Sequence, residues 1–381
     1  MHKKTGRIIY RAGLLAGLLW AVIATGAAAQ ETGVVEIHGY VDLTYFDFQT
    51  ESDPVLPYTD GFGSPGFKGD STFDNNHMTL YFGADIADNI RFNSEFHFEH
   101  SYKELEMPEA SIAWKWSEPF VLTFGRFWLP FGTLGKHRIY TPTNGLVSYP
   151  YTVSMLIPFH NADNGIKASG RAGMLEYQVA VMNGASGLDE ASGGDISSIG
   201  FAQDNNQNKR VVGNIGFNPV EGLNLGASYT TGKWDDANEA DLNFWGADAQ
   251  YQAGRLDLRG EYAQGDVENP VGAVGGITGP LTDNFGVLSL GDIQRSAYFI
   301  QAAFKILDEQ AGVQSLDLIV RYDAFDRDDR DDAGDRARWS FGLNAAPAPH
   351  FHFKAEYQKV DEKEGFEADN DGVMLQAVAD F

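Results

Sequence analysis

Apolar and polar residues alternate with a period of two along most of the chain from Val35 onward. Successive side chains of a β-strand point to opposite faces, so this pattern predicts strands with one apolar and one polar face. Sixteen such segments can be counted. By residue number they are 35–48, 77–86, 90–99, 109–116, 120–128, 164–169, 175–182, 210–218, 223–234, 242–251, 255–264, 296–306, 316–325, 338–344, 351–360 and 372–381.

The connections between these segments alternate between long and short, with few exceptions. Short turns join segments two and three, and then every second pair after them, and longer Gly-, Ser- or Asn-rich stretches join the others. An even number of strands then places both chain ends on the side of the short turns. This layout is typical of bacterial outer-membrane proteins, and it predicts an all-β fold, a 16-stranded antiparallel transmembrane β-barrel. A soluble sandwich would not require that asymmetry of connections.

Residues 1–29 have the pattern of a cleaved signal peptide. Lys3, Lys4, Arg7 and Arg11 precede the apolar segment 14–23, and the small residues 27–29 follow it. We therefore expect export, cleavage and a mature barrel of residues 30–381 in the outer membrane of a Gram-negative bacterium. No later apolar run reaches the length of about 18 residues that a spanning helix requires. The chain has no cysteine, which excludes disulfides and thiolate chemistry.

The polar face of the predicted strands carries charges of both signs. Arg91, Lys115, Lys167, Arg259 and Arg321 are expected to face the lumen. The same faces carry acidic residues, which include Glu95, Glu176, Asp257, Glu261, Asp317, Asp323 and Glu356. Unpaired charge is costly in a dry interior, so we expect water inside. Sixteen strands enclose a bore that is wide enough for an aqueous channel.

The stretch from Pro119 to Ala162 contains no acidic residue, although the chain has 53 Asp and Glu among 381 residues. It begins as the fifth predicted strand and continues as a long irregular connection, the third of the long ones. Loops of this length are usually functional. We expect this loop to fold into the bore, with Lys136, His137, Arg138 and Arg126 attracting anions at a constriction. A large exposed loop that merely lacks acids is the alternative.

The segment Gly125-Arg126-Phe127-Trp128-Leu129-Pro130-Phe131-Gly132 resembles the "G-basic-x-x-x-P-F-G" stretch of the phosphate-selective porin O and P family. Residues 163–166 and 177–184 are similar to the following hairpin of that family. The terminal Phe381 on an alternating strand resembles the assembly signal of bacterial outer-membrane barrels. The resemblance covers mainly residues 110–185, and the rest of the chain matches as a generic porin.

The resemblance implies a homotrimeric channel for passive diffusion of small hydrophilic solutes, with a third outer loop that narrows the pore. It also implies outer-membrane lipid and lipopolysaccharide as partners, and recognition of Phe381 by the outer-membrane assembly machinery. The family's anion route uses a ladder of lumen arginines and a lysine cluster. Bases and acids alternate on most lumen faces here, so a preference for anions or phosphate stays a prediction.

Other functions receive less support from the residues. No cofactor or metal site is expected, because His97 and His100, three apart on a strand, point to opposite faces. The acidic run 326–332 contains interleaved arginines and lacks the full calcium-loop pattern. No catalytic triad stands out, so we expect no enzyme. The net charge of −25 argues against nucleic acid as a partner. A general or cation-preferring porin and a structural or adhesive barrel remain open.

Overall fold

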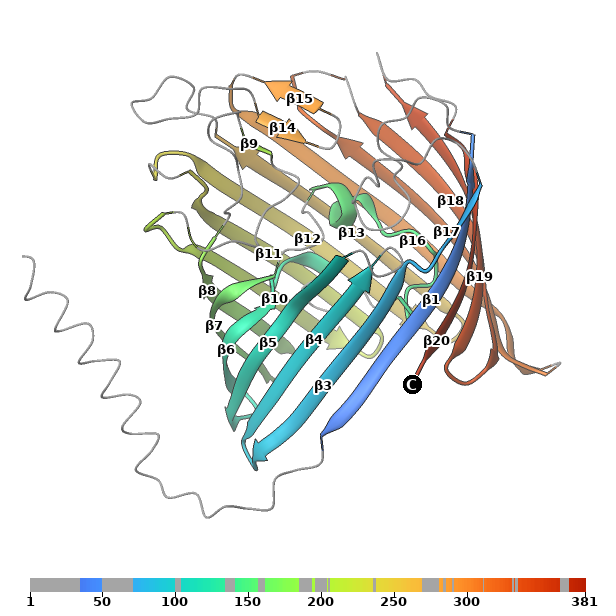
Figure 1. The fold of residues 1–381 in the computed structure, drawn as a ribbon, viewed down its shortest axis with the longest axis horizontal. Helices are drawn as coiled ribbons and strands as arrows, with labels where there is room; N and C mark the ends of the chain where they lie inside the picture. The colour runs from blue at the N-terminus through green and yellow to red at the C-terminus, as the bar shows by residue number, and fades with distance from the viewer. Residues whose placement is uncertain are drawn as a thin grey trace, which may run out of the picture.

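The structure is a computed structural model, and it describes residues 35–49, 71–99, 104–133, 141–156, 162–184, 194–195, 204, 206–235, 238–268, 281–283, 286–289, 291–310, 312–330, 332, 335–363 and 370–381. Sixteen antiparallel strands form a closed barrel (Figure 1). They are β1 (Glu36–Phe48), β3 (His77–Ala87), β4 (Ile90–Glu99), β5 (Glu104–Ser117), β6 (Phe120–Trp128), β7 (Ala162–Ala172), β8 (Leu175–Met182), β10 (Arg210–Val220), β11 (Leu223–Lys233), β12 (Asp241–Ala253), β13 (Leu256–Val267), β16 (Ile293–Gln310), β17 (Val313–Asp326), β18 (Arg336–Ala348), β19 (Phe351–Glu362) and β20 (Gly372–Asp380).

The barrel closes where the first strand meets the last. β1 pairs with β3 on one side and with β20 on the other, and Phe381 exchanges backbone hydrogen bonds of 2.9 and 3.1 Å with Gly39. Every second connection is a tight turn, as the sequence predicts, and these turns lie at the end of the barrel that also holds Phe381. We call this the short-turn end and the opposite one the long-loop end. The predicted fold class is confirmed.

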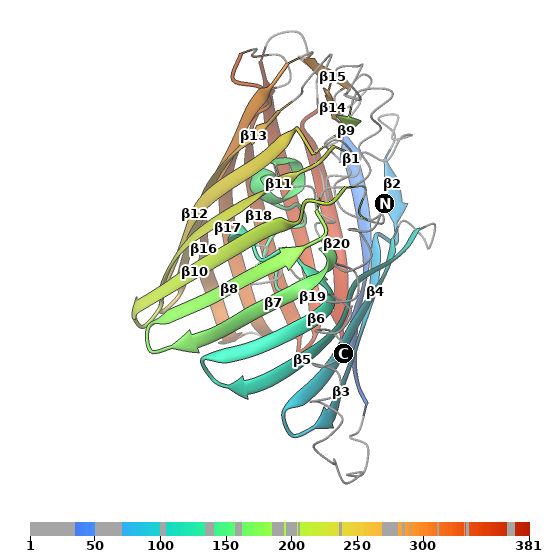
Figure 2. The same cartoon turned by 90° about the vertical axis from the view of Figure 1, so that its left-hand side faces the viewer.

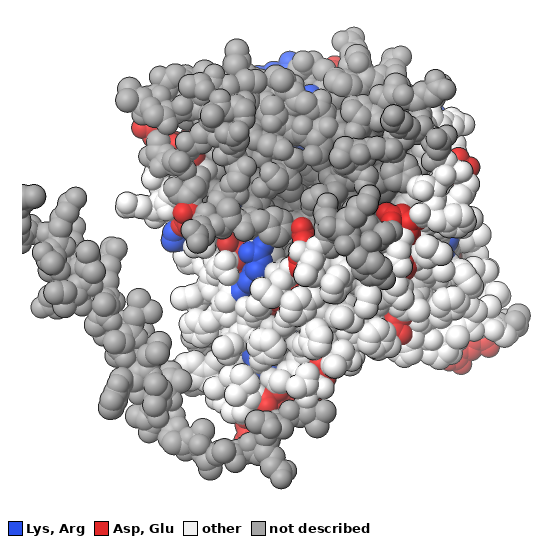
Figure 3. All heavy atoms as spheres, viewed as in Figure 1, with Lys and Arg blue, Asp and Glu red and all other residues white. Residues whose placement is uncertain are grey.

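The two faces of the wall differ as a membrane requires. Large apolar side chains are exposed on the outer face, where Ile300 is 65% exposed and Ile166 is 51% exposed. Charged atoms are sparse on the described wall between the two ends in Figure 3. A row of Tyr and Trp follows the long-loop half of the outer face from β11 to β19, as interfacial side chains do in membrane barrels. Its members are Tyr229, Trp245, Tyr262, Tyr298, Tyr322, Trp339 and Tyr357.

Short elements occupy the connections, and the sequence pattern did not predict them. β2 (Thr72–Asp74) extends the pairing of β1, and β9 (Gly194–Asp195), β14 (Leu281–Asp283) and β15 (Gly286–Ser289) form a separate small sheet. A π-helical turn, η1 (Thr152–Leu156), packs against β13, β16 and β17. It lies within the outline of the barrel in two perpendicular views (Figures 1 and 2). Among the described residues, no helix is long and apolar enough to cross a membrane.

A buried apolar cluster fills part of the interior at the long-loop end. Inner-face side chains of β8, β10, β12, β13, β16 and β17 form its wall side, and residues that follow β6 cover them. Water is therefore excluded from this sector, which the alternation pattern alone did not predict. The members with the largest side chains are Phe127, Leu129, Phe131, Tyr151, Leu156, Met182, Trp234, Leu242, Phe244, Ile293 and Phe325.

Candidate functional site

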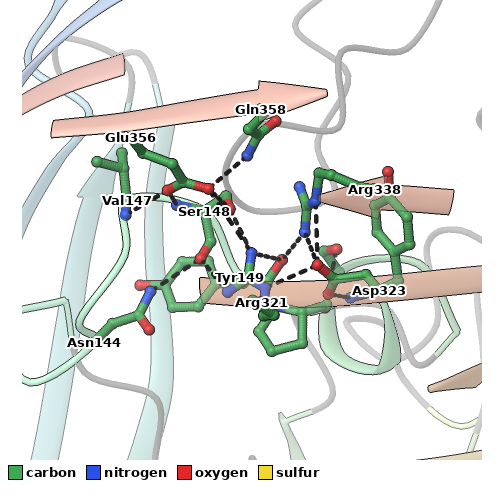
Figure 4. Close-up of polar contacts among 12 residues, drawn as sticks. Asn144, Val147, Ser148, Tyr149, Arg321, Asp323, Arg338, Glu356 and Gln358 are labelled. Carbon is green, nitrogen blue, oxygen red and sulfur yellow. Dashed lines mark hydrogen bonds and ion pairs between the residues drawn. The ribbon is translucent and has the colours of Figure 1, made fainter. Parts of the chain in front are cut away.

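The described part of the loop after β6 is bound to the inner wall by acidic side chains of the barrel. Glu356 on β19 accepts hydrogen bonds from the backbone N–H of Val147 at 2.8 Å and of Ser148 at 2.9 Å, and from the Ser148 hydroxyl at 2.6 Å. Asp323 on β17 accepts one from the N–H of Tyr151 at 3.1 Å. Hydrogen bonds to a carboxylate are about twice as strong as neutral ones. The loop backbone is thus held at several points by fixed charges (Figure 4).

A third carboxylate holds both ends of the loop together. Glu261 on β13 accepts hydrogen bonds from the hydroxyl and the backbone N–H of Thr133, near the loop's start. It also accepts one from the Thr152 hydroxyl at 3.1 Å, near the loop's end. The adjacent N–H of Gly132 donates to Ser228 Oγ on β11 at 2.9 Å. One wall residue therefore fixes two loop positions that are distant in sequence.

Two buried arginines complete the attachment. Arg321 donates to the Ser148 carbonyl at 3.0 Å and to Asp323 at 2.8 Å. Arg338 lies 3.2 Å from the same Asp323 carboxylate and donates to the Tyr149 carbonyl at 2.7 Å. All three charged side chains are fully buried, so each guanidinium is compensated by acidic neighbours and by loop carbonyls rather than by solvent. Figure 4 shows these side chains of β17 and β18, together with Glu356 of β19, converging on the loop.

The remaining contacts link the loop to β1 and β19. Lys354 donates to the Thr141 carbonyl at 2.5 Å, and the Thr141 hydroxyl lies 2.8 Å from that of Tyr149 and 3.2 Å from that of Tyr40. The ring of Tyr151, which directly precedes η1, lies under Arg338, with the guanidinium carbon 4.3 Å from the ring centre. Burial raises the pKa of Tyr151 to about 12, although the nearby Arg338 opposes this shift. Tyr151 is therefore neutral at physiological pH.

At least four of the five basic residues predicted to face the lumen are paired with acids. Arg91, Lys115, Lys167, Arg259 and Arg321 all lie on the inner-facing side of their strands. Lys167 lies 4.8 Å from the centre of the Phe127 ring. The ion pairs are those of Arg91 with Glu36 and Asp85, Lys115 with Glu118, Arg259 with Asp257 and Arg321 with Asp323. These bases do not form a ladder of arginines without acidic partners.

The predicted anion-attracting residues are placed differently from one another. Lys136, His137 and Arg138 lie outside the described residues, between Thr133 and Thr141, whose positions the contacts above define. Their proposed role at a constriction stays a prediction.

Arg126, in contrast, is placed by the register of its strand. It pairs with Ala110 of β5 and Asn164 of β7, and it shares a face with Phe124 and Ile166, which are 40% and 51% exposed. This is the outer face of the wall. The alternation on β6 could not show this, because the strand is apolar on both faces. The described structure therefore places Arg126 on the opposite face of the wall from the five basic residues predicted to face the lumen.

Of the two histidines expected not to share a metal, His97 contacts a carboxylate, and His100 lies outside the described residues. His97 Nε2 lies 2.6 Å from Glu95, whose other oxygen accepts a hydrogen bond from Trp128 Nε1 at 3.0 Å. His77 Nδ1 lies 2.9 Å from Asp42. Within the described ranges, no three His, Asp or Glu side chains gather as a metal ion would require.

The loop anchors are the residues whose role the sequence did not reveal. Glu261, Asp323 and Glu356 were expected on the lumen face, but not as acceptors for a loop. The one available signal was the contrast between these inner acids and the acid-free stretch. A loop that has hydrogen-bond donors but no carboxylates can bind to a wall that carries carboxylates. Ser148 and Thr133 carry no distinguishing pattern of their own.

Comparisons with known proteins agree with this architecture. A model of the Gram-negative porin family matches residues 15–378. A protein of Aquifex aeolicus (strain VF5), described as uncharacterized, is 23% identical over 367 residues, covering 88% of this chain and 78% of that protein. The anion-selective porin from Comamonas acidovorans superposes with a TM-score of 0.60 at 13% identity, over 92% of this chain and 99% of that one. OmpT of Vibrio cholerae, folded in vitro and in its trimer form, superposes with a TM-score of 0.56 at 11% identity, over 92% of this chain and 100% of that one. At these identities the two structural likenesses show the fold alone.

Proposed function

The chain belongs to the Gram-negative porin family, and from this premise we propose that it is a homotrimeric outer-membrane channel for small hydrophilic solutes, narrowed by the loop after β6. The attachment of this loop to Glu261, Asp323 and Glu356 carries the proposal. A segment held at several points by buried charged groups occupies a defined part of the bore, as a fixed constriction must. Diffusion through such a channel needs no cofactor and no catalytic group.

We assign anion preference to Lys136, His137 and Arg138. They lie in the same acid-free stretch as the anchored segment, between positions that are fixed to the wall. A basic side chain at a narrow and partly desolvated point of a pore attracts anions more strongly than in bulk water. The acid-paired bases of the described wall argue against the phosphate selectivity that the resemblance implied, because they do not form an arginine ladder without acidic partners.

The experiment is the reversal potential of the purified protein in a planar bilayer under a KCl gradient. We expect the wild type to prefer chloride and Lys136→Glu/Arg138→Glu to lose or invert that preference. The control is Lys209→Glu/Lys233→Glu, which changes the net charge by the same amount at the long-loop end. We expect this control to keep the sign of the wild-type reversal potential. Equal effects of the two double variants would contradict a local selectivity site and leave only the overall charge.

A cation-preferring porin is the second candidate, and one observation favours it. At least four of the five predicted lumen bases are paired with acids, and the chain carries a net charge of −25. An acidic channel entrance concentrates cations. In the same experiment this candidate predicts potassium preference and little change in either double variant. Negligible conductance of the wild type would instead favour a structural or adhesive barrel.

Export and assembly complete the proposal. Residues 1–29 are proposed as the cleaved signal peptide, and Phe381 as the residue that the assembly machinery recognises. Phe381 is 63% exposed at the short-turn end, where a factor on the periplasmic side can reach it. N-terminal sequencing of the mature protein tests the first point, since residue 30 should come first.

A further inference from the structure

Three consecutive residues of the loop, 145–147, lie on three neighbouring strands of the wall. The wall residues are Ile319 on β17, Gly342 on β18 and Glu356 on β19, which are direct cross-strand partners and form one row on the inner face. The loop residues contact this row in the same order along the chain. The third contact, between Val147 and Glu356, is drawn in Figure 4. The loop therefore crosses the wall with one residue per strand, and its depth depends on how each pair fits.

The first two pairs have opposite arrangements of small and large side chains. In the first pair the glycine belongs to the loop, and a Cβ on Gly145 would lie less than 3.0 Å from Cδ1 of Ile319. In the second pair the glycine belongs to the wall, and a Cβ on Gly342 would lie less than 3.0 Å from Cδ2 of Leu146. Ile319 and Leu146 are each only 1% exposed, so neither side chain has open space to rotate into. The loop and the wall are thus complementary in size at both positions.

Both glycines are required for space rather than for backbone conformation. Neither Gly145 nor Gly342 has the positive φ that favours glycine over other residues. A glycine inside a strand is destabilising by about 0.5–1 kcal/mol relative to alanine, and it often marks a place where another backbone approaches closely. Gly342 lies inside β18 and is paired on both sides. The close approach of the loop is therefore the reason for a glycine at this position.

We propose that Gly342 is a specificity-determining residue of the channel, because its missing side chain admits Leu146 and so sets how closely the loop lies against the wall. This inference rests on the proposed function, in which the loop narrows the bore. Ordinary contacts of a Cβ begin at 3.4 Å, so a methyl group at position 342 must displace Leu146 and the loop backbone from the wall. In the proposed channel the bore lies on the other side of the loop. A larger residue 342 therefore makes the bore narrower and lowers the size of solute that can pass.

This effect has the opposite sign to that of detaching the loop. Loss of the hydrogen bonds to Glu356 frees the loop and widens the bore, whereas a larger residue 342 displaces a loop that stays attached. Attachment persists because Glu261, Asp323 and Arg338 hold the loop at other positions. The width of the bore thus has two separate determinants, the charged groups that retain the loop and the glycine that sets its depth.

The test combines single-channel conductance in a planar bilayer with polyethylene glycols of increasing size, of which those small enough to enter the channel lower its current. Gly342→Ala should lose part of the wild-type conductance and admit only smaller polymers, and Gly342→Val should lose more. Gly342→Ala/Leu146→Ala should restore both wild-type values, because the removed leucine atoms leave space for the new methyl group. The control is Gly216→Ala on the inner face of β10, where the nearest atoms to a Cβ lie at 3.6 Å or more. It should keep the wild-type conductance.

A role in packing alone would give different results. Gly342→Ala would then lower the unfolding temperature but keep the conductance and the polymer limit, while Glu356→Gln still produced the larger conductance. That outcome would overturn the inference and leave the proposed function intact. If neither variant changed the current, the loop would not limit permeation, and the proposed constriction would fail as well. Transitions of Gly342→Ala to a larger conductance would show that its loop detaches, which would overturn the claim that residue 342 sets the depth.

A variant of the loop itself serves if Gly342→Ala does not fold. Gly145→Ala leaves the wall unchanged and places its methyl group against Cδ1 of Ile319. It should reduce the conductance, and Gly145→Ala/Ile319→Ala should restore it. An unchanged conductance in the single variant, or no restoration in the double variant, would contradict the size complementarity on which the inference depends.

Discussion

Replacing Glu356 with glutamine tests whether the inner acids hold the loop in the bore. One carboxylate oxygen accepts the N–H of Val147 at 2.8 Å and that of Ser148 at 2.9 Å. The other accepts the Ser148 hydroxyl at 2.6 Å and the Gln358 amide at 2.8 Å. Whichever way the new side-chain amide is oriented, its N–H₂ group faces two donors and cannot accept a hydrogen bond from either.

The size of the effect follows from these contacts. Two hydrogen bonds to a charged acceptor are lost, at about 1.5–3 kcal/mol each. Arg321, which lies 4.0 Å from Glu356, also loses part of its compensation in a buried position. Rotation of neighbouring side chains recovers some of this, so we take about 3 kcal/mol as the net loss. Since 1.4 kcal/mol is tenfold, the ratio of attached to detached loop falls by about 100-fold.

Single-channel recording in a planar bilayer shows the consequence. We expect the wild type to have one stable conductance, and Glu356→Gln to show brief transitions to a larger one as the loop leaves the bore. The matched control is Asp257→Asn, the same charge change at another inner acid, which contacts Gln250 and Arg259 and, in the described part of the loop, no loop residue. It should keep the stable wild-type conductance.

Two results would refute the reasoning. Glu356→Gln could fold to the same amount and conduct without added transitions, which would mean that the loop does not limit the current. Alternatively, both variants could show equal transitions, which would point to general loosening of the barrel. Thermal unfolding, followed by the shift of the folded band on a gel, separates a detached loop from an unfolded wall.

Three further substitutions test the local geometry. Among the described residues the Tyr151 hydroxyl has no hydrogen-bond partner, while its ring contacts Arg338. Tyr151→Phe should therefore unfold at the same temperature as the wild type or slightly higher near neutral pH. Burial raises the pKa of Tyr151 from 10.0 to about 12, so the unfolded state loses this proton at a lower pH than the folded state. The free energy of unfolding of the wild type therefore falls by about 2–3 kcal/mol as the pH rises from 10 to 12. Unfolding measured across that range should show that this part of the decrease is absent in Tyr151→Phe. Gly125→Ala, which meets the Ala110 carbonyl, should destabilise the barrel by about 2–4 kcal/mol, measured by its unfolding temperature. Gly173 has φ +62 but open space around it, so Gly173→Ala should lower the free energy of unfolding by only about 1 kcal/mol. Equal losses of stability in Gly125→Ala and Gly173→Ala would contradict the steric argument.

The strands were predictable because the membrane imposes the pattern that defines them. The bounds Phe120–Trp128 and Leu175–Met182 agree with the prediction at both ends. β16 extends to Ile293–Gln310, well beyond the predicted 296–306, because pairing continues past the lipid, where apolar side chains are no longer required. β2 was not predicted, since its three residues are ordered by pairing with a strand far earlier in the chain.

The interior was less predictable than the wall. Alternation assigns a face to each side chain but does not show what that face meets. Some strands are apolar on both faces, and their inward-facing residues include Val212, Leu242 and Phe244. These side chains are apolar because they contact apolar side chains of the loop rather than water. The outward position of Arg126 has the same origin, since β6 is apolar on both faces and gives no periodic signal.

The absence of acids from the loop has a cause that is separate from ion selectivity. In the described part, Glu261, Asp323 and Glu356 accept its N–H and hydroxyl groups, so a carboxylate among those donors would meet another carboxylate in a buried setting. Attachment alone therefore explains the composition there, and only bases such as Lys136 and Arg138 bear on permeating ions. The two roles can be separated: Lys136→Glu/Arg138→Glu should change the reversal potential without lowering the unfolding temperature. Glu356→Gln should lower that temperature, and it should reduce selectivity only through the fraction of time that the loop is detached.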